Sequence, residues 1–98
     1  MNFGFRNKKS TSDRECKCGS WKSHWLNYSG KLWPNKCCVN NCENEATLGA
    51  HVINGESRNE AIVPMCDRHN KVEETFYLKD GTVCVSANVA DTCGRHNR

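Results

Sequence analysis

Alternating apolar and polar positions predict two short strands in the middle of the chain. In residues 46–53 (ATLGAHVI), the leucine, the second alanine and the valine fall on one face, and His51 falls on the other. The turn signal Asn54-Gly55 and a polar loop then lead to a second strand over residues 61–65 (AIVPM). The proline in this second run is typical of an edge strand or a strand end.

Aromatic residues at helical spacing predict a short helix ahead of these strands. Trp21, Trp25 and Tyr28 recur at helical intervals and therefore share one face. Ser20 suits the N-cap, and Gly30 occupies the position that glycine favours just past a helix C-terminus. We expect about two turns, with the aromatic face buried in the core rather than used to stack bases.

Two more elements are predicted in the second half of the chain. Residues 66–75 are expected to be helical, because Asp67 suits a first turn and two apolar residues lie four apart. Residues 76–85 form two alternating runs around Asp80-Gly81, a strong signal for a β-hairpin. Cys84 in the second run is expected to be a small buried hydrophobic residue rather than a ligand.

Size and composition imply that the core alone is a weak source of stability. The chain has 98 residues, of which 37% are hydrophobic. This allows one modest core, set against an ordering entropy of roughly 1–2 kcal/mol per residue. We expect a single domain over residues 15–94, a disordered tail over residues 1–14 and a short tail over residues 95–98.

The eight cysteines raise the choice between disulfides and metal binding. The first 13 residues contain no apolar run of signal-peptide length, and no stretch approaches the roughly 18 apolar residues that a membrane span requires. We therefore expect a cytoplasmic protein that does not contact a membrane. Its thiols would be reduced and available to a metal ion.

Two close pairs of ligand-type residues predict a zinc site. A Cys-Cys-Val-Asn-Asn-Cys run places either Cys37 or Cys38 near Cys42, and its asparagines suit a tight turn. Cys66 and His69 follow, three residues apart. This donor set is the one that tetrahedral Zn²⁺ requires. We expect one structural Zn²⁺ on Cys37, Cys42, Cys66 and His69, with Cys38 as the alternative to Cys37, and we expect the ion to supply folding free energy.

The remaining cysteines allow a second zinc site. Cys16 and Cys18 near one end of the chain and Cys93 near the other would need a fourth ligand, either His24 or Cys84. Such a site would tie both ends of the chain together. The alternative is a set of reduced, unligated thiols.

Charge is distributed unevenly along the sequence. Residues 1–36 carry eight Lys and Arg against two Asp and Glu, whereas residues 37–98 carry six against nine. The basic part is compatible with DNA or RNA as a partner, but it is weak evidence for one, because solvated charge is the commoner explanation. A protein partner is the other expectation, and we expect the chain itself to be a monomer.

Part of the sequence resembles the treble-clef zinc proteins of the HNH, or ββα-metal, family. The resemblance rests on residues 49–52 (GAHV), on Asn59 and on residues 62–71 (IVPMCDRHNK), and it covers about residues 36–76. It implies a hairpin that leads through a loop into a helix, with a zinc knuckle bracing the unit.

The same resemblance implies roles for specific residues. His51 resembles the family's general base, Asn59 resembles the residue that orients it, and the activity would need Mg²⁺ at the scissile phosphate. Two positions that often bind this ion in the family are here Ala50, which cannot bind a cation, and Asn70, a weak neutral ligand. The departure favours a non-catalytic member, and whether the protein is an enzyme stays open.

The expected architecture is therefore a small α+β, zinc-stabilised treble-clef domain of HNH-like ββα type, with a short N-terminal helix and a C-terminal β-hairpin. The expected function is a zinc-binding module for nucleic-acid or protein recognition. One alternative is an HNH-type endonuclease. Another is a thiol-based redox or metal sensor that uses Cys16 and Cys18.

Overall fold

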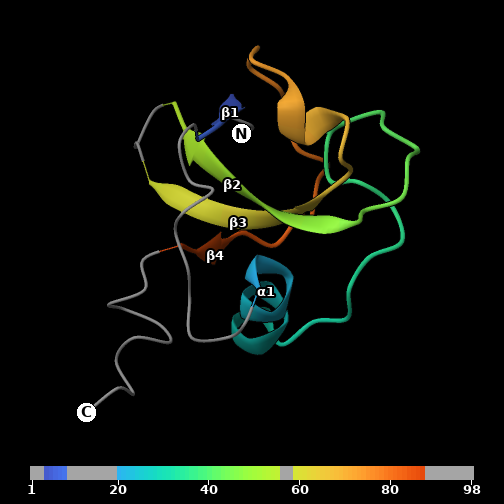
Figure 1. Cartoon of the computed structure of the whole chain (residues 1–98), viewed down its shortest axis with the longest axis vertical. Coiled ribbons are helices and arrows are strands. Elements are labelled where there is room, and N and C mark those ends of the chain that lie inside the picture. The colour runs from blue at the N-terminus through green and yellow to red at the C-terminus, as the bar shows by residue number, and fades with distance from the viewer. Residues whose placement is uncertain (1–3, 9–19, 56–58, 88–98) are drawn as a thin grey trace.

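A four-stranded antiparallel sheet with one helix against it forms the body of the protein (Figure 1). A computed structural model describes residues 4–8, 20–55 and 59–87. The strands are β1 (Phe5–Asn7), β2 (Leu48–Asn54), β3 (Glu60–Met65) and β4 (Val85–Ser86), and they lie in the order β1-β2-β3-β4. The α+β class expected from the sequence is thus observed.

The hairpin β2–β3 is the centre of the sheet and confirms the two predicted strands. His51 lies opposite Ile62, and the Asn54 amide donates to the Asn59 carbonyl at 3.1 Å where the hairpin closes. The strands begin and end within about two residues of the predicted positions. The predicted alternation also holds, because Ala50 and Val52 pack into one buried cluster whereas His51 contacts the helix on the other face.

Strand β1 corrects the expectation of a disordered segment over residues 1–14. Phe5 and Phe76 exchange two backbone hydrogen bonds of 2.8 Å, and Asn7 lies opposite Val52 in the sheet. These remote partners order residues 5–7, which nothing in the local sequence signals. Residues 1–3 and 9–14 lie outside the described residues.

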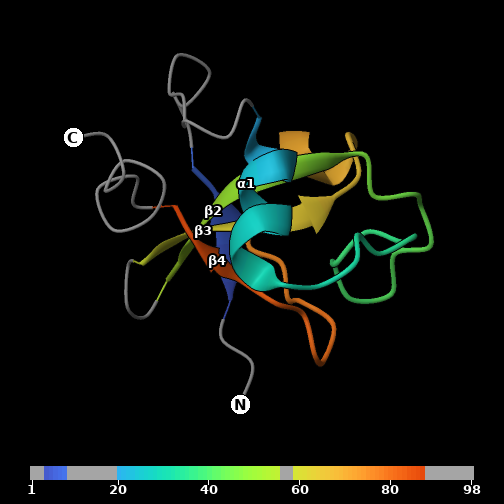
Figure 2. The ribbon, with the colours of Figure 1, turned by 90° about the horizontal axis from the view of Figure 1, so that it is seen from below.

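Helix α1 (Trp21–Ser29) begins and ends as predicted and covers one face of the sheet (Figure 2). The Ser23 amide donates to the Ser20 hydroxyl at 3.0 Å, and Gly30 adopts a left-handed φ of 69°. Trp25 is buried, but Tyr28 is 39% exposed, so the expectation of a fully inward aromatic face is wrong at Tyr28. Within the described residues, no helix combines the length and the apolar character needed to cross a membrane.

The sheet separates two hydrophobic clusters. The cluster under α1 contains Trp25, Ile62, Val85 and Ala87. The cluster on the opposite face is larger and contains the buried cysteines, Ala50, Val52, Val63, Met65, Phe76 and Leu78. The predicted metal ligands therefore lie on the face that α1 does not cover.

The helix predicted over residues 66–75 is reduced to a single 3₁₀ turn, η1 (His69–Lys71). Val72 is already extended, with φ −75° and ψ 149°. The Asn7 side-chain amide donates to the carbonyls of His69 and Val72, both at 2.8 Å. A longer helix would need those carbonyls for its own hydrogen bonds, so the contact from β1 favours the short turn.

The C-terminal hairpin predicted over residues 76–85 forms its turn but does not pair its two arms. Gly81 has φ 83°, and the Thr82 amide donates to the Lys79 carbonyl at 3.2 Å. Leu78 instead bridges to Val39, and Val85 pairs with Ile62 of β3. Each arm buries its apolar side chain against another part of the chain. Cys84 is exposed as a result, contrary to the expectation that it would be buried.

Candidate metal centre

Four side chains from three segments converge beside the sheet, three buried cysteines and a half-buried histidine. Their ligand atoms, the sulfurs of Cys37, Cys42 and Cys66 and a ring nitrogen of His69, all lie within 4.8 Å of one another. The turn before β2 supplies the first two cysteines, the end of β3 leads directly into Cys66, and η1 supplies His69. The structure thus brings together the four residues that the sequence singled out.

The spacing of these atoms suits one tetrahedral ion. The Sγ atoms of Cys42 and Cys66 are 3.9 Å apart, and Nδ1 of His69 lies 3.4 Å from Sγ of Cys66 and 3.9 Å from Sγ of Cys37. Metal bonds of zinc length would give about 3.8 Å between two sulfurs and about 3.6 Å between sulfur and nitrogen. The sulfurs are free thiols and much too far apart for a disulfide. The cluster could therefore hold a metal ion.

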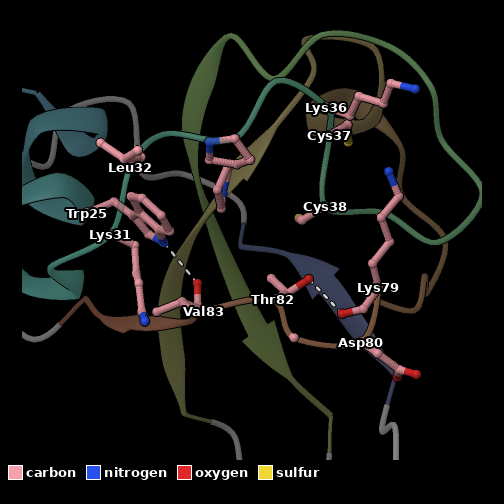
Figure 3. A pocket seen from close by; sticks show the side chains of 13 residues that line it. Trp25, Lys31, Leu32, Lys36, Cys37, Cys38, Lys79, Asp80, Thr82 and Val83 are labelled. Atoms are coloured by element: carbon pink, nitrogen blue, oxygen red, sulfur yellow. Dashed lines mark hydrogen bonds between the residues drawn. The ribbon is translucent and has the colours of Figure 1, made fainter.

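A tight turn explains why Cys37, rather than its neighbour, joins the cluster. Asn41 adopts φ 68°, a left-handed conformation that asparagine tolerates, and the Cys42 amide donates to the Val39 carbonyl at 3.0 Å. The Val39 amide donates to Cys37 Sγ at 3.5 Å. Cys38 leaves the chain in a different direction (Figure 3) and is buried outside the cluster.

The thiols of the cluster differ in acidity. Burial tends to raise the pKa of Cys66, but hydrogen bonds from the His69 amide and ring and from the Asn44 side chain lower it to about 6. Burial raises the pKa of Cys37 to about 11. One ligand is thus a ready thiolate, whereas Cys37 would lose its proton only on meeting a cation.

Residues outside the ligand set hold the metal-binding loops in place. The Lys79 ammonium donates to the Cys42 carbonyl at 2.6 Å, and Asn7 donates to the carbonyl of His69 as described above. Neither residue was predicted from the sequence to act here, since they lie 37 and 62 positions from the ligands they support. Such contacts fix the orientation of the ligands.

Replacement of Asn7 by alanine is expected to lower the affinity for a metal ion by about 10–100-fold. The change removes both hydrogen bonds to the turn that carries His69 and leaves its carbonyls without these donors. Competition with a chromophoric chelator measures the affinity. Arg6→Ala is the matched control, because Arg6 is the exposed neighbour in the same strand. Equal affinities for the two variants would contradict the supporting role of Asn7.

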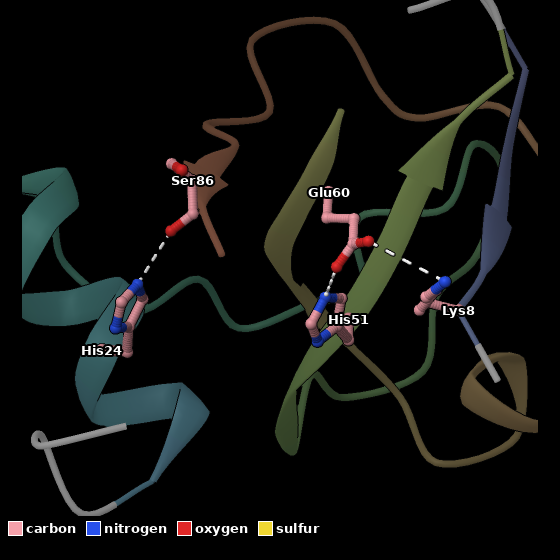
Figure 4. A network of polar contacts seen from close by, with 5 residues as sticks. All are labelled: Lys8, His24, His51, Glu60 and Ser86. Carbon is pink, nitrogen blue, oxygen red and sulfur yellow. Dashed lines mark hydrogen bonds and ion pairs between the residues drawn. The ribbon is translucent and has the colours of Figure 1, made fainter. Parts of the chain in front are cut away.

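A second metal site remains a prediction. Cys16, Cys18 and Cys93 lie outside the described residues. His24 is fully buried, and its Nε2 donates to the Ser86 carbonyl at 2.8 Å (Figure 4). Cys84 is exposed. This hydrogen bond joins α1 to β4, so the His24 ring has a structural role.

Of the two candidate catalytic residues, His51 lies in β2 on the side of α1, and Asn59 lies just before β3. His51 is 6% exposed, its ring centre is 5.5 Å from that of Trp21, and its Nε2 donates to Glu60 Oε1 at 2.8 Å (Figure 4). Lys8 lies 3.8 Å from the other carboxylate oxygen. Asn59 is exposed at the start of the β3 arm. The histidine is thus covered by protein and engaged with a carboxylate.

Glu60 is a partner of His51 that sequence reasoning missed. The register places His51 opposite Ile62, so Glu60, two residues before Ile62, projects from the same face of the sheet. To predict this pairing from the sequence, the register of the hairpin would have to be known. The register depends on the length of the loop after Asn54-Gly55, and the sequence pattern does not fix that length.

No protein-family model, no curated protein and no solved structure matches this chain. The class of this protein is therefore inferred from its fold and its candidate site alone. The protein is a small α+β protein with a Cys₃His cluster that could hold a metal ion.

Proposed function

We propose that the protein is a zinc-binding, treble-clef-like module without catalytic activity that serves in nucleic-acid or protein recognition. The observation that carries the proposal is the set of four candidate protein ligands in one cluster, in which the three cysteines are buried and His69 is half-buried. Structural zinc sites use four protein ligands, whereas catalytic sites keep one position for water or substrate. A donor set of three thiolates and one imidazole favours zinc over the hard cations that prefer oxygen.

The order of the elements supports the treble-clef comparison. A cysteine turn comes first, the β2–β3 hairpin follows, and Cys66 and His69 come directly after the hairpin. This is the order that the resemblance to the HNH family implies. The departure from that family is the η1 turn, which stands where the family has a helix.

The surroundings of His51 favour the non-catalytic version of this module. A general base must reach the water molecule that it activates. His51 is buried under Trp21 and donates to Glu60, while Ala50 beside it is 1% exposed and points to the opposite face. The cluster of thiols lies across the sheet from the histidine. A metal ion held there would brace three segments of the fold.

Zinc stoichiometry in two neighbouring cysteine variants tests the proposal. Cys37→Ala is expected to bind one zinc ion fewer than the wild type, whereas Cys38→Ala is expected to bind the same number. Both thiols are buried, but only Cys37 belongs to the cluster. Native mass spectrometry under reducing conditions gives the count. A wild-type chain without zinc, or loss of zinc from Cys38→Ala alone, would overturn the assignment.

A further inference from the structure

A groove of about 400 Å³ lies between the segment that follows α1 and the turn at residues 79–83 (Figure 3). Its walls include Leu32, Pro34 and Val83 and also the buried Cys38. Leu32 is 93% exposed, which is unusual for a large hydrophobic side chain beside a groove. The volume is within the range of pockets that bind small ligands, which is room enough for an apolar side chain of a partner.

Three lysines surround this apolar surface, two of them on the segment that follows α1 and the third beside the turn at residues 79–83. Lys31 follows α1, Lys36 precedes the first metal ligand, and Lys79 precedes the turn, whereas Asp80 is the one acidic residue in the lining. Lys36 pairs with Glu43 in an exposed ion pair, which contributes little and can be exchanged for a partner's carboxylate. The groove thus offers positive charge around apolar walls.

The aromatic rings at the groove are not available to stack on bases. Trp25 is 3% exposed, and its indole donates to the Val83 carbonyl at 2.8 Å. Trp33 packs against Trp25, and the Lys22 ammonium lies over the Trp33 ring, 4.8 Å from the ring centre. The exposed tyrosines, Tyr28 and Tyr77, do not line the groove. Binding of single-stranded nucleic acid relies on accessible aromatic faces, so these rings favour another partner.

We propose that this groove binds an acidic peptide segment of a protein partner, with an apolar side chain of the peptide against Leu32 and its carboxylates beside the lysines. The assignment rests on the proposed function, because it specifies the partner of the recognition module. The positive charge at the rim and the apolar surface between the charges favour a protein segment as the partner, because such a segment can complement both.

Two features link the metal cluster to the groove. Lys36 is the direct neighbour of Cys37, and the Lys79 ammonium donates to the carbonyl of Cys42 at 2.6 Å. Both lysines are therefore positioned by the loops that carry metal ligands. Peptide binding is expected to require the zinc-loaded protein.

The test uses three fluorescein-labelled probes with the full-length, zinc-loaded chain. The first is a short peptide that alternates leucine and glutamate, the second has glutamine in place of glutamate, and the third is a mixed-sequence single-stranded oligonucleotide. Fluorescence anisotropy gives the affinities at low and at physiological salt. We expect the glutamate peptide to bind best, and salt to weaken its binding.

Lysine-to-glutamate variants test whether the peptide binds at the groove. Lys31→Glu and Lys36→Glu are each expected to weaken binding of the glutamate peptide by about threefold, and the double variant by about tenfold. Lys71→Glu is the matched control, since Lys71 is 72% exposed, forms only a surface ion pair with Asp67 and does not line the groove. Absence of peptide binding, equal binding of the glutamine peptide, or an equal effect of Lys71→Glu would overturn the proposal. Preferred binding of the oligonucleotide through Lys31 and Lys36 would replace the peptide with nucleic acid.

Zinc content and circular dichroism of the same samples separate this inference from the proposed function. A folded, zinc-loaded chain that binds no peptide overturns the groove assignment and leaves the zinc module standing. A chain that is folded but binds no zinc overturns both the module and the zinc requirement of the groove, and the lysine reversals on that folded chain then decide whether the groove binds the peptide.

Discussion

Removal of the metal ion with EDTA at neutral pH is expected to unfold the chain. The cluster joins three segments, and two of them, the cysteine turn and the end of the hairpin, supply residues to the larger hydrophobic cluster. Binding of a structural zinc ion contributes on the order of 10–16 kcal/mol, which equals or exceeds the roughly 5–15 kcal/mol of net stability of most domains. Near-ultraviolet circular dichroism and tryptophan fluorescence, to which the buried Trp25 contributes, report the loss of packing.

Two controls make the chelation experiment specific. EDTA that has been saturated with zinc beforehand should leave the signals unchanged, and zinc added after chelation should restore them. If the near-ultraviolet signal persists in metal-free protein, the ion is not the source of stability. The apolar clusters on the two faces of the sheet would then hold the fold by themselves.

The dependence on metal follows from the irregular path of the segment that carries the first two ligands. Residues 31–47 contain no helix or strand of their own, and Lys36 and Glu45 form only an isolated bridge. Cys37 and Cys42 are nevertheless 0% and 6% exposed. Backbone hydrogen bonds such as that from the Cys37 amide to the Asn44 carbonyl, at 2.8 Å, anchor the loop without building a helix or a strand. An ion that binds both thiols adds a direct link between them and offsets part of the cost of ordering the loop.

Elements that depend on local chemistry could be predicted from the sequence. Ser20 and Gly30 cap α1 because a hydroxyl and a left-handed glycine satisfy helix ends wherever the helix lies. The turn at Asn41 also follows from the residue itself. The ligand set was predictable for the same reason, since each ligand pair is close in sequence and its spacing is the signal.

Elements that depend on remote partners could not be predicted. Residues 66–75 have a helical pattern, but the Asn7 side-chain amide, more than 60 positions away, donates to the carbonyls of His69 and Val72 and favours the short turn. The arms of the predicted C-terminal hairpin pair with Val39 and with β3 instead of with each other. In the site, Glu60 and Lys79 reach their partners through sheet register and loop packing, which leave no pattern in the sequence around them.

Gly49→Ala is expected to destabilise the fold through the contact between β2 and α1. A Cβ at this position would lie 2.6 Å from the Trp21 carbonyl carbon and 2.8 Å from the Lys22 amide nitrogen. Both atoms are backbone at the start of the helix, so no side-chain rotation relieves the clash, and α1 must move away from the sheet. Trp21 would then lose its ring contact with His51 of β2. The expected loss is about 1–3 kcal/mol in the free energy of unfolding.

Chemical denaturation in the presence of zinc measures this loss, and Gly55→Ala is the matched control. A Cβ at Gly55 would lie 3.5 Å from the Gly4 carbonyl oxygen, an ordinary contact, so this variant should stay within about 0.5 kcal/mol of the wild type. Zinc content should be unchanged in both variants, because the ligands lie across the sheet from α1. Without a clash, alanine would favour the strand over glycine by roughly 0.5–1 kcal/mol. A Gly49→Ala variant as stable as Gly55→Ala would therefore show that α1 does not press against β2 at this glycine.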